Sequence, residues 1–355
     1  MKIWIPSFLL WRYEVRYAKY IDLYGSLGFY LKEKLIQYKY RYFVRPNVVY
    51  IYANKRNVGD YISHLGVKTI VNIDGPSSFC STVYLKRLEK QLEKYRSRNP
   101  DVMLVIGGGG LFQDAFTEFW NLVLATKLKY CVVGVGINKM HGRKEMPAHT
   151  LKNVIASASY ALVRDSESIN RLGSYAQSGP VMMSVCPSLN YFSRAFWNKA
   201  PHNNRLLLHM VHPSDLRLAE VQRDIITRNL KDIATKLGLT YAEHSNMSAN
   251  HEKCLHSVRN ARIVVSSRLH GCIMSYGMGI PFLPLYCDYK MESFVMTHTK
   301  VNGIEAKLAE RQDVLSASID ATLKSFNPSQ TDVNAKITLN TEFGKKLSLL
   351  AKHGL

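Results

Sequence analysis

From about residue 48 onward, short runs of apolar and β-branched residues alternate with longer amphipathic stretches. Each short run is continuously apolar, which is typical of strands that are buried on both faces of a sheet. The stretches between the runs have the length and periodicity of helices. This order predicts an α/β protein whose parallel sheets are covered by helices on both sides.

The first series of runs ends near residue 190. Its predicted strands are Val48–Tyr52, Lys68–Asn72, Val102–Ile106, Cys131–Val135, Tyr160–Val163 and Val181–Val185. Between them, Tyr84–Arg98 and Ala148–Ser157 are the clearest predicted helices. We therefore predict a first Rossmann-like domain over residues 46–190.

The pattern restarts after a connection around Pro187 to Asn204. The predicted strands of the second series are Arg205–Met210, Thr240–Glu243, Arg262–Ser266 and Phe282–Tyr286. Predicted helices cover Ser214–Leu237, ended by Gly238, and about Asn250–Asn260. We predict a second Rossmann-like domain over residues 191–330 and a cleft between the two domains. The tail from Asn302 reads as helical with a break near Pro328, and residues 331–355 form a predicted C-terminal helical segment.

The charge of the chain favours anionic partners. Lys and Arg total 47 against 27 acidic residues, which gives a formal net charge of +20. No zinc-finger spacing and no long basic tail accompany this charge, so a nucleic-acid partner is not expected. The six cysteines include no CxxC pair, and they predict buried free thiols in a reducing compartment.

Residues 1–45 form a basic, aromatic segment. Tyr13, Tyr17, Tyr20 and Tyr24 follow one another at helical spacing. This face suits either packing against the main body or contact with a membrane or a lipid-linked acceptor. The apolar stretch Ile3–Trp11 is too short to span a bilayer. We therefore predict a cytoplasmic protein that could contact the inner face of the membrane through this segment.

Glycines follow several of the predicted strands. Asn57-Val58-Gly59-Asp60 comes after the first strand, and Gly107, Gly108 and Gly109 begin a run of four glycines after another. Glycines at such turns let backbone N–H groups approach a ligand, and Asp60 could cap the next helix. We predict that Asn57, Gly59, Asp60 and these three glycines bind substrate. The spacing matches neither a dinucleotide-binding fingerprint nor a P-loop.

Two arginines stand at predicted strand ends. Arg164 precedes Ser166, where a helix is expected to begin, so the pair is predicted to hold a carboxylate or phosphate. Arg268 and His270 follow a buried strand in the segment Arg268-Leu269-His270-Gly271, next to a helix of small residues. A helix N-terminus adds unpaired amides and partial positive charge there. We predict His270 as the general acid or base of this anion site. Lys290, after the next strand, is predicted to reach the same place.

Taken in order, the segments NVGD, GGGG, GVGIN, VRDSES, SSRLHG and GIPFLPLYCDYK resemble the polysaccharide pyruvyltransferase family. The resemblance extends from about Asn57 to Lys290. It implies a GT-B-like fold and transfer of the enolpyruvyl group of phosphoenolpyruvate to a free or lipid-linked saccharide, which forms a pyruvate ketal and releases phosphate. It implies no cofactor and no metal.

Within this family, Arg164 and Arg268 would grip the carboxylate and phosphate of the donor. His270, with a pKa near neutrality, would protonate the enol carbon. One departure stands at Cys186-Pro187, where the family commonly has Asp-Pro. A GT-B glycosyltransferase with a nucleotide-sugar donor shares the fold and the cleft, and it remains the alternative function.

Overall fold

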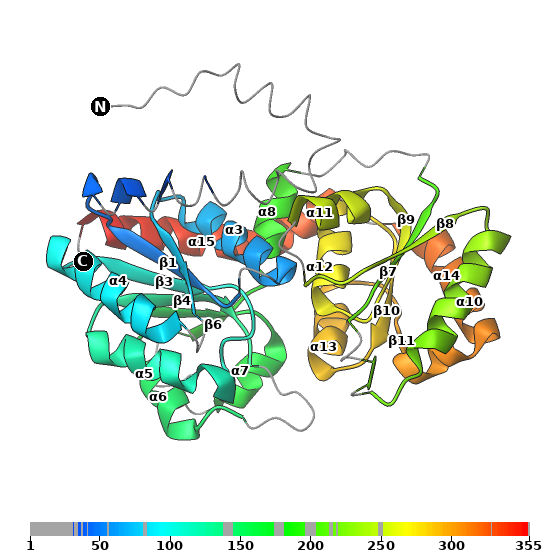
Figure 1. Ribbon diagram of the computed structural model, residues 1–355, viewed down its shortest axis with the longest axis horizontal. Helices are drawn as coiled ribbons and strands as arrows, with labels where there is room; N and C mark the ends of the chain where they lie inside the picture. Colours follow the sequence, from blue (N-terminus) through cyan, green and yellow to red (C-terminus); the bar gives the residue numbers. More distant parts are fainter. Residues whose placement is uncertain are drawn as a thin grey trace, which may run out of the picture.

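The fold is that of a computed structural model. It describes residues 31, 35–36, 38–40, 42–54, 57–80, 84–137, 145–173, 181–195, 204–212, 216–217, 219–247, 251–327 and 329–353. Two α/β domains lie side by side, the N-terminal one at the left and the C-terminal one at the right of Figure 1. This architecture confirms the predicted pair of Rossmann-like domains. The tyrosine face predicted for residues 13–24 lies outside the described residues.

The N-terminal domain contains a parallel sheet with the strand order β2-β1-β3-β4-β5-β6. Its strands are β1 (Val48–Tyr52), β2 (Ser77–Phe79), β3 (Met103–Gly107), β4 (Tyr130–Val135), β5 (Tyr160–Val163) and β6 (Val181–Met183). The strands β1, β3 and β4 are buried along their whole length. Continuous apolar strands of this kind require helices on both faces of the sheet.

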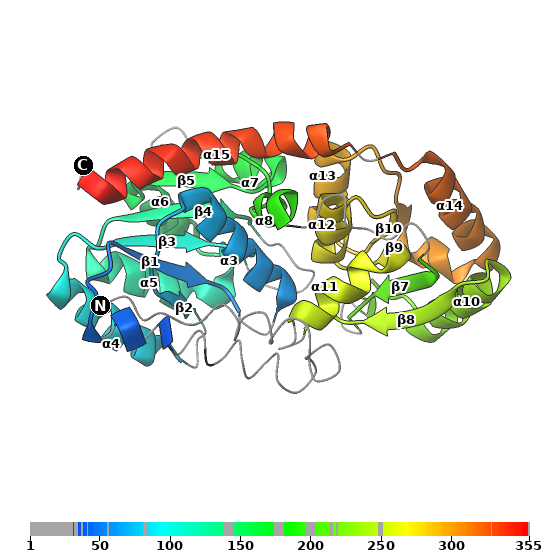
Figure 2. The same cartoon turned by 90° about the horizontal axis from the view of Figure 1, so that it is seen from above.

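Helices cover both faces of this sheet, as Figures 1 and 2 show. The helices of the domain are α3 (Val58–Val71), α4 (Leu85–Arg98), α5 (Thr117–Thr126), α6 (Ala148–Ser157), α7 (Ser166–Leu172) and α8 (Ser188–Ala195), with the 3-10 turn η3 (Asp114–Phe116). Leu88, Trp120 and Leu151 from α4, α5 and α6 join the apolar core on one face. Val67 of α3 belongs to the core on the opposite face.

The C-terminal domain repeats this arrangement with a parallel sheet in the order β11-β10-β9-β7-β8. Its strands are β7 (Leu206–Met210), β8 (Thr240–His244), β9 (Ala261–Ser266), β10 (Phe282–Tyr286) and β11 (Ile304–Glu305). Its helices are α10 (Arg223–Lys236), α11 (His251–Arg259), α12 (Leu269–Met278), α13 (Tyr289–His298) and α14 (Gln312–Ser325), with the 3-10 turn η5 (Ala306–Glu310).

The C-terminal helix α15 (Gln330–His353) crosses from the C-terminal domain back over the N-terminal one (Figure 2). Its side chains Phe343 and Leu347 join the apolar core beneath β1, β3 and β4. Asn340 Nδ2 donates a hydrogen bond to Asn190 Oδ1 at 2.7 Å. The segment predicted as a separate helical tail therefore packs as a layer of the N-terminal domain.

One predicted strand is wrong. Lys68–Asn72 is the last turn of α3 and its C-cap, and Asn72 ends the helix in the left-handed conformation with φ 53°. The β-branched pair Ile70 and Val71 suggested a strand, but both are buried in the apolar core that α3 and α15 share with the sheet. Short apolar runs of a buried helix cannot be told from a strand by periodicity alone.

Two helix predictions also change. The helix predicted over Ser214–Leu237 is confirmed as α10 from Arg223 to Lys236, but a turn at residues 219–220 separates it from the helical residues 216–217. The predicted connection from Pro187 to Asn204 contains the helix α8. This short helix packs against α3 and α12, so it joins the two domains beside the site.

Candidate active site

The strand order of each sheet reverses once, and both reversals face the same cavity. In the N-terminal sheet β1 lies between β2 and β3, and in the C-terminal sheet β7 lies between β8 and β9. Loops that leave such a reversal at the carboxyl ends of the strands form a ligand crevice. The segments after β1, β3, β7 and β9 line one cavity of about 420 Å³ between the domains. Its lining residues are Ala53, Asn54, Asn57, Asp60, Gly110, Gln113, Phe116, Arg164, His212, Asn246, Met247, Ser267, Arg268, Leu269, His270, Asp288 and Lys290.

Asn57 caps the helix α3 at the edge of the cavity. Its Oδ1 accepts a hydrogen bond from the Gly59 N–H at 3.0 Å. The Val58 N–H donates across the domain boundary to the Asn246 carbonyl oxygen at 2.8 Å. Asp60 was the predicted cap, but Asn57 takes this role because it occupies the extended position before the first helical residue.

Asp60 instead lies in the first turn of α3 and lines the cavity. Burial raises the pKa of its carboxyl group to about 7, although Arg268, Arg164 and Lys290 act to lower it. The desolvation of the charged form therefore outweighs three nearby cations. The cavity contains a carboxyl group that is partly protonated at neutral pH.

His270 lies directly against the backbone of Gly59. A Cβ atom at Gly59 would lie 2.1 Å from His270 Nδ1, so only glycine leaves room for the imidazole ring. On its other side, His270 Nε2 lies 3.4 Å from Ser63 Oγ. The need for Gly59 is thus steric, and Gly59 does not itself line the cavity.

The protonation state of His270 differs from the one we predicted. Burial lowers its pKa well below the ordinary value, and Arg164, Arg268 and Lys290 lower it further. The imidazole is therefore neutral at neutral pH in the absence of a ligand. A pKa near neutrality, which we expected for this proton donor, belongs to Asp60 instead.

Arg164 extends from the end of β5 as a buried cation. Its Nε donates to Asp165 Oδ2 at 2.9 Å, and both side chains are almost fully buried. Asp165 in turn caps α7 by accepting from the Ser168 N–H at 2.8 Å. Within the described part of the chain, Arg164 Nη2 is buried and has no hydrogen-bond partner. Nη2 lies against the backbone of Gly136, where a Cβ atom would come within 2.4 Å of it. Arg164 also lines the cavity, so its buried guanidinium group supplies a fixed positive charge for an anion there.

Arg268 and His270 reach the cavity from a helix start rather than from a strand. The strand β9 ends at Ser266, and Arg268 is the N-cap residue of α12. Lys290 also lines the cavity, as we predicted, and its Nζ forms an ion pair with Asp288 Oδ2 at 3.0 Å. Asp288 caps α13 and so fixes the position of this cation.

The glycines after β3 shape the site without lining it. Gly108 and Gly109 adopt φ values of 87° and 94°, which side chains rarely tolerate. A Cβ atom at Gly107 would lie 2.4 Å from the Val133 carbonyl oxygen. A Cβ atom at Gly109 would lie 2.6 Å from Asp60 Oδ1. Gly107 therefore allows close packing against β4, and Gly108 and Gly109 allow it around Asp60, whereas Gly110 is the one that lines the cavity.

Ser166 does not lie with the other predicted site residues. Its Oγ lies 3.4 Å from Thr297 Oγ1 of α13, outside the residues that line the cavity. The contact joins α7 of one domain to α13 of the other. We therefore assign Ser166 to the domain interface.

Several lining residues escaped the sequence analysis. Asn54, Gln113, Phe116, His212 and Asn246 belong to no motif, and they stand in loops whose course only the fold determines. Their positions just after β1, β3, β7 and β8 could have marked them, because the carboxyl ends of these strands meet at the crevice.

Cys186 is connected to the site through one intervening residue, Ser63. Its buried Sγ lies 3.4 Å from Ser63 Oγ, the hydroxyl that also contacts His270 Nε2. Cys186 does not line the cavity. Cys186 is also close enough to act electrostatically on Arg164, so a different residue at this position would affect the site through Ser63 and His270 and through Arg164.

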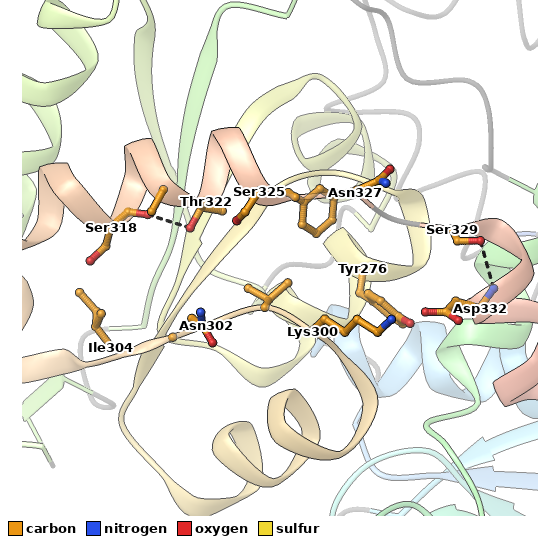
Figure 3. A pocket seen from close by; sticks show the side chains of 14 residues that line it. Tyr276, Lys300, Asn302, Ile304, Ser318, Thr322, Ser325, Asn327, Ser329 and Asp332 are labelled. Carbon is orange, nitrogen blue, oxygen red and sulfur yellow. Dashed lines mark hydrogen bonds between the residues drawn. The ribbon is translucent and has the colours of Figure 1, made fainter.

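A second cavity of about 350 Å³ lies at the far end of α12 (Figure 3). Tyr276, Lys300 and Asp332 point toward one end of it (Figure 3). The hydroxyl group of Tyr276 has no hydrogen-bond partner among the described residues. This cavity has one cation and one carboxylate, so it lacks the excess positive charge of the cavity around His270.

Three further observations concern metal ligands, cysteines and membrane-spanning helices. In the described ranges, no group of three or more His, Cys, Asp and Glu side chains is placed to hold a metal ion. None of the six cysteines, all of which lie in described ranges, forms a disulfide bond. No helix in the described part of the chain combines the length and the apolar character needed to cross a bilayer.

Solved structures with a similar fold share little sequence with the chain. A UDP-GlcNAc 2-epimerase from Methanocaldococcus jannaschii aligns with a TM-score of 0.55 at 12% identity, covering 85% of this chain and 99% of that one. A putative UDP-N-acetylglucosamine 2-epimerase from Listeria monocytogenes gives 0.54 at 11% identity, covering 84% and 96%. MnaA of S. aureus, solved with UDP, gives 0.54 at 10% identity, covering 83% and 97%. These GT-B proteins support the two-domain fold alone.

Sequence comparison identifies the family. No curated protein matches the chain. The profile of the polysaccharide pyruvyl transferase family, however, matches residues 57–289. The match begins at the Asn57 cap and ends beside Lys290, so it contains almost every charged residue of the cavity. The chain belongs to the polysaccharide pyruvyl transferase family.

Proposed function

We propose that the protein transfers the enolpyruvyl group of phosphoenolpyruvate to two hydroxyl groups of a saccharide. The products are a pyruvate ketal and inorganic phosphate. The observation that carries this proposal is the buried guanidinium group of Arg164 in a cavity that Arg268 and Lys290 also line. Phosphoenolpyruvate has a carboxylate and a phosphate close together, and fixed guanidinium groups bind such oxygens in pairs.

His270 is the proposed base of the reaction. A neutral imidazole can take the proton of an attacking hydroxyl, and its position between Gly59 and Ser63 holds the ring in one orientation. The imidazolium formed in this way would then be stabilised by the negative charges of the bound donor. Arg164 and Arg268 would stabilise the departing phosphate.

The acceptor would occupy the part of the cavity that lies near the second domain's loops. Asn246 is 1% exposed, and within the described ranges its Oδ1 has no hydrogen-bond partner. An unsatisfied buried acceptor of this kind suits a sugar hydroxyl, because burying it unpaired is unfavourable. We propose that Asn246 accepts a hydrogen bond from the saccharide.

Residues 1–45 remain a proposed contact with a membrane or a lipid-linked acceptor. Of the described residues in this segment, Leu35, Tyr38, Tyr42 and Phe43 are each more than half exposed. Lys94 Nζ lies 5.0 Å from the centre of the Tyr42 ring. Exposed aromatic groups beside cations favour an anionic interface. The protein would then act at the inner face of the membrane.

To test this function, the protein is incubated with phosphoenolpyruvate and a panel of free and lipid-linked saccharides. We expect phosphate release that depends on the saccharide, with the ketal detected by mass spectrometry and NMR. In parallel, nucleotide sugars are supplied as donors with the same acceptors. Cleavage of a nucleotide sugar, without any use of phosphoenolpyruvate, would establish the glycosyltransferase alternative and reject this function.

The His270→Ala variant tests the site in the same assay. We expect turnover to fall by about 10²–10⁴-fold, because a positioned proton acceptor is lost. The thermal unfolding midpoint of the variant should stay close to that of the parent, since His270 lines the cavity and its truncation enlarges an existing space instead of opening a new one in the core. Activity within a few-fold of the parent would remove His270 from the mechanism.

A further inference from the structure

The side chain of Asp60 is buried and also lines the cavity around His270. The residue is 8% exposed and lines the cavity together with Arg164, Arg268 and Lys290. Its carboxyl group lies beside Gly109, whose missing Cβ atom leaves room for Oδ1. Asn57 caps α3, so the Asp60 side chain is not used to satisfy the helix N-terminus. The carboxyl group is also hydrogen-bonded to the side chain of Asn57, so its place at the edge of the cavity is fixed.

The charges around this carboxyl group would ordinarily keep it ionised. Three cations lower its pKa, yet burial raises the value to about 7. A bound donor with a carboxylate and a phosphate adds negative charge nearby, which raises the pKa of a carboxyl group further. The protonated form of Asp60 therefore prevails once such a donor is present.

The neighbouring imidazole is in the complementary state. His270 packs on Gly59, the residue just before Asp60, and it is neutral because burial and the same three cations lower its pKa. Two titratable groups whose environments move their pKa values apart are typical of an acid and a base in one site. The acid comes from α3 of the first domain and the base from α12 of the second.

We infer that Asp60 is the catalytic acid that protonates the methylene carbon of the enolpyruvyl donor. This inference rests on the proposed function and extends it. The O–H bond of Asp60 breaks, and the electron pair of the donor's double bond forms the new C–H bond. The neighbouring carbon becomes cationic and is stabilised by its phosphate-ester oxygen.

The remaining steps account for the protons that the two saccharide hydroxyl groups lose. The first sugar hydroxyl forms a C–O bond at the cationic carbon, and its proton passes to His270. The second hydroxyl forms another C–O bond at the same carbon as the bond to phosphate breaks, and its proton restores Asp60. The proton on His270 leaves with the phosphate, so both side chains return to their starting states.

Asp60→Asn is the test variant, because the amide preserves size and polarity but cannot donate this proton to carbon. We expect saccharide-dependent phosphate release to fall by about 10²–10⁴-fold. Binding of phosphoenolpyruvate, measured by calorimetry, should persist at equal or higher affinity because a group that can carry negative charge is removed. Asp60→Glu should recover part of the rate. A merely structural role for Asp60 would change donor binding and the unfolding midpoint together.

The pH dependence gives a second readout. The acid must be protonated, so kcat/KM of the parent should decrease as the pH rises through the pKa of Asp60. The residual activity of Asp60→Asn should lack this decrease. A variant that keeps a rate within a few-fold of the parent, or the same alkaline decrease, overturns the assignment.

A measurement without turnover separates this inference from the proposed function. Infrared difference spectra of the unliganded parent should show a carboxylic acid that titrates near neutral pH and is missing from Asp60→Asn. Absence of this signal overturns the role of Asp60, even where phosphoenolpyruvate is consumed. A parent that shows the signal but uses only nucleotide sugars overturns the proposed function, and the protonation step is rejected with it.

Discussion

At the scale of single residues, the site depends on a glycine, whose lack of a Cβ atom leaves room for a catalytic side chain. Gly59 stands in the first turn of α3, where alanine would ordinarily favour the helix. A Cβ atom there would lie 2.1 Å from two atoms of the His270 ring, so the imidazole would have to move. A helix position that should tolerate alanine is thus reserved for glycine by a side chain of the other domain.

The Gly59→Ala variant should therefore lose activity more than stability. We expect kcat/KM to fall by about 100-fold, since displacing a catalytic group by about 1 Å has an effect of this size. Overpacking lowers stability by about 1–3 kcal/mol, and part of this loss is offset by the higher helix propensity of alanine. Steady-state kinetics and thermal unfolding measure the two effects. Unchanged kinetics would show that His270 does not need its present position.

At the scale of secondary-structure elements, α15 stabilises the domain that it crosses. Gly344 contacts α3 so closely that a Cβ atom would lie 2.0 Å from the Ile70 carbonyl oxygen. Ser348 Oγ donates a hydrogen bond to the next carbonyl, that of Val71. The contact lies at the end of α3 that is remote from Gly59 and Asp60.

Gly344→Ala should lower the free energy of unfolding by about 1–3 kcal/mol, although the same change in an exposed helix would raise it by about 1 kcal/mol. Denaturant titration measures the change. Glu342→Ala, at an exposed position of the same helix, is the matched control and should have little effect. The kcat/KM of Gly344→Ala should stay within a few-fold of the parent. A stabilised Gly344→Ala protein would contradict the close packing of α15 on α3.

The elements themselves were largely predictable. Strands such as Tyr160–Val163 and Phe282–Tyr286 agree with the sequence analysis to the residue, because a buried parallel strand is continuously apolar. The strand predicted at Lys68–Asn72 is wrong because a buried turn of a helix can have the same run of apolar residues. The helix α8 was missed because Pro187 and the following polar residues resemble a connection.

At the scale of the whole molecule, stability should depend on keeping buried imidazoles neutral. Burial lowers the pKa of His64 to about 3 and those of His209 and His298 to about 4, and it lowers that of His270 as well. The unfolded chain binds a proton at each of these groups below its ordinary pKa near 6.5. Stability is therefore complete above that pH and decreases as the pH falls toward the folded-state values.

We predict that the free energy of unfolding decreases from pH 7 to pH 5 by up to about 1.4 kcal/mol per pH unit for each of these histidines. Asp60 has the opposite effect, equal to that of one histidine. Its raised pKa means that the folded protein keeps a proton that the unfolded chain loses in this pH range, so its contribution to stability increases as the pH falls. Denaturant titrations at several pH values measure the slope. In the His209→Gln variant, the slope should be smaller by the contribution of one proton. A free energy of unfolding that does not change between pH 7 and pH 5 would contradict the neutral state of the buried histidines.

By itself, the sequence determined the two-domain α/β architecture and most of the charged residues of the cavity. Buried parallel strands require continuous apolar runs, and residues that follow them meet at the carboxyl edge of a sheet, so Arg164, Arg268, His270 and Lys290 could be found from their places along the chain. Only the tertiary structure decided the protonation states. Burial between the two domains makes His270 neutral and Asp60 an acid, because desolvation depends on packing across the cleft.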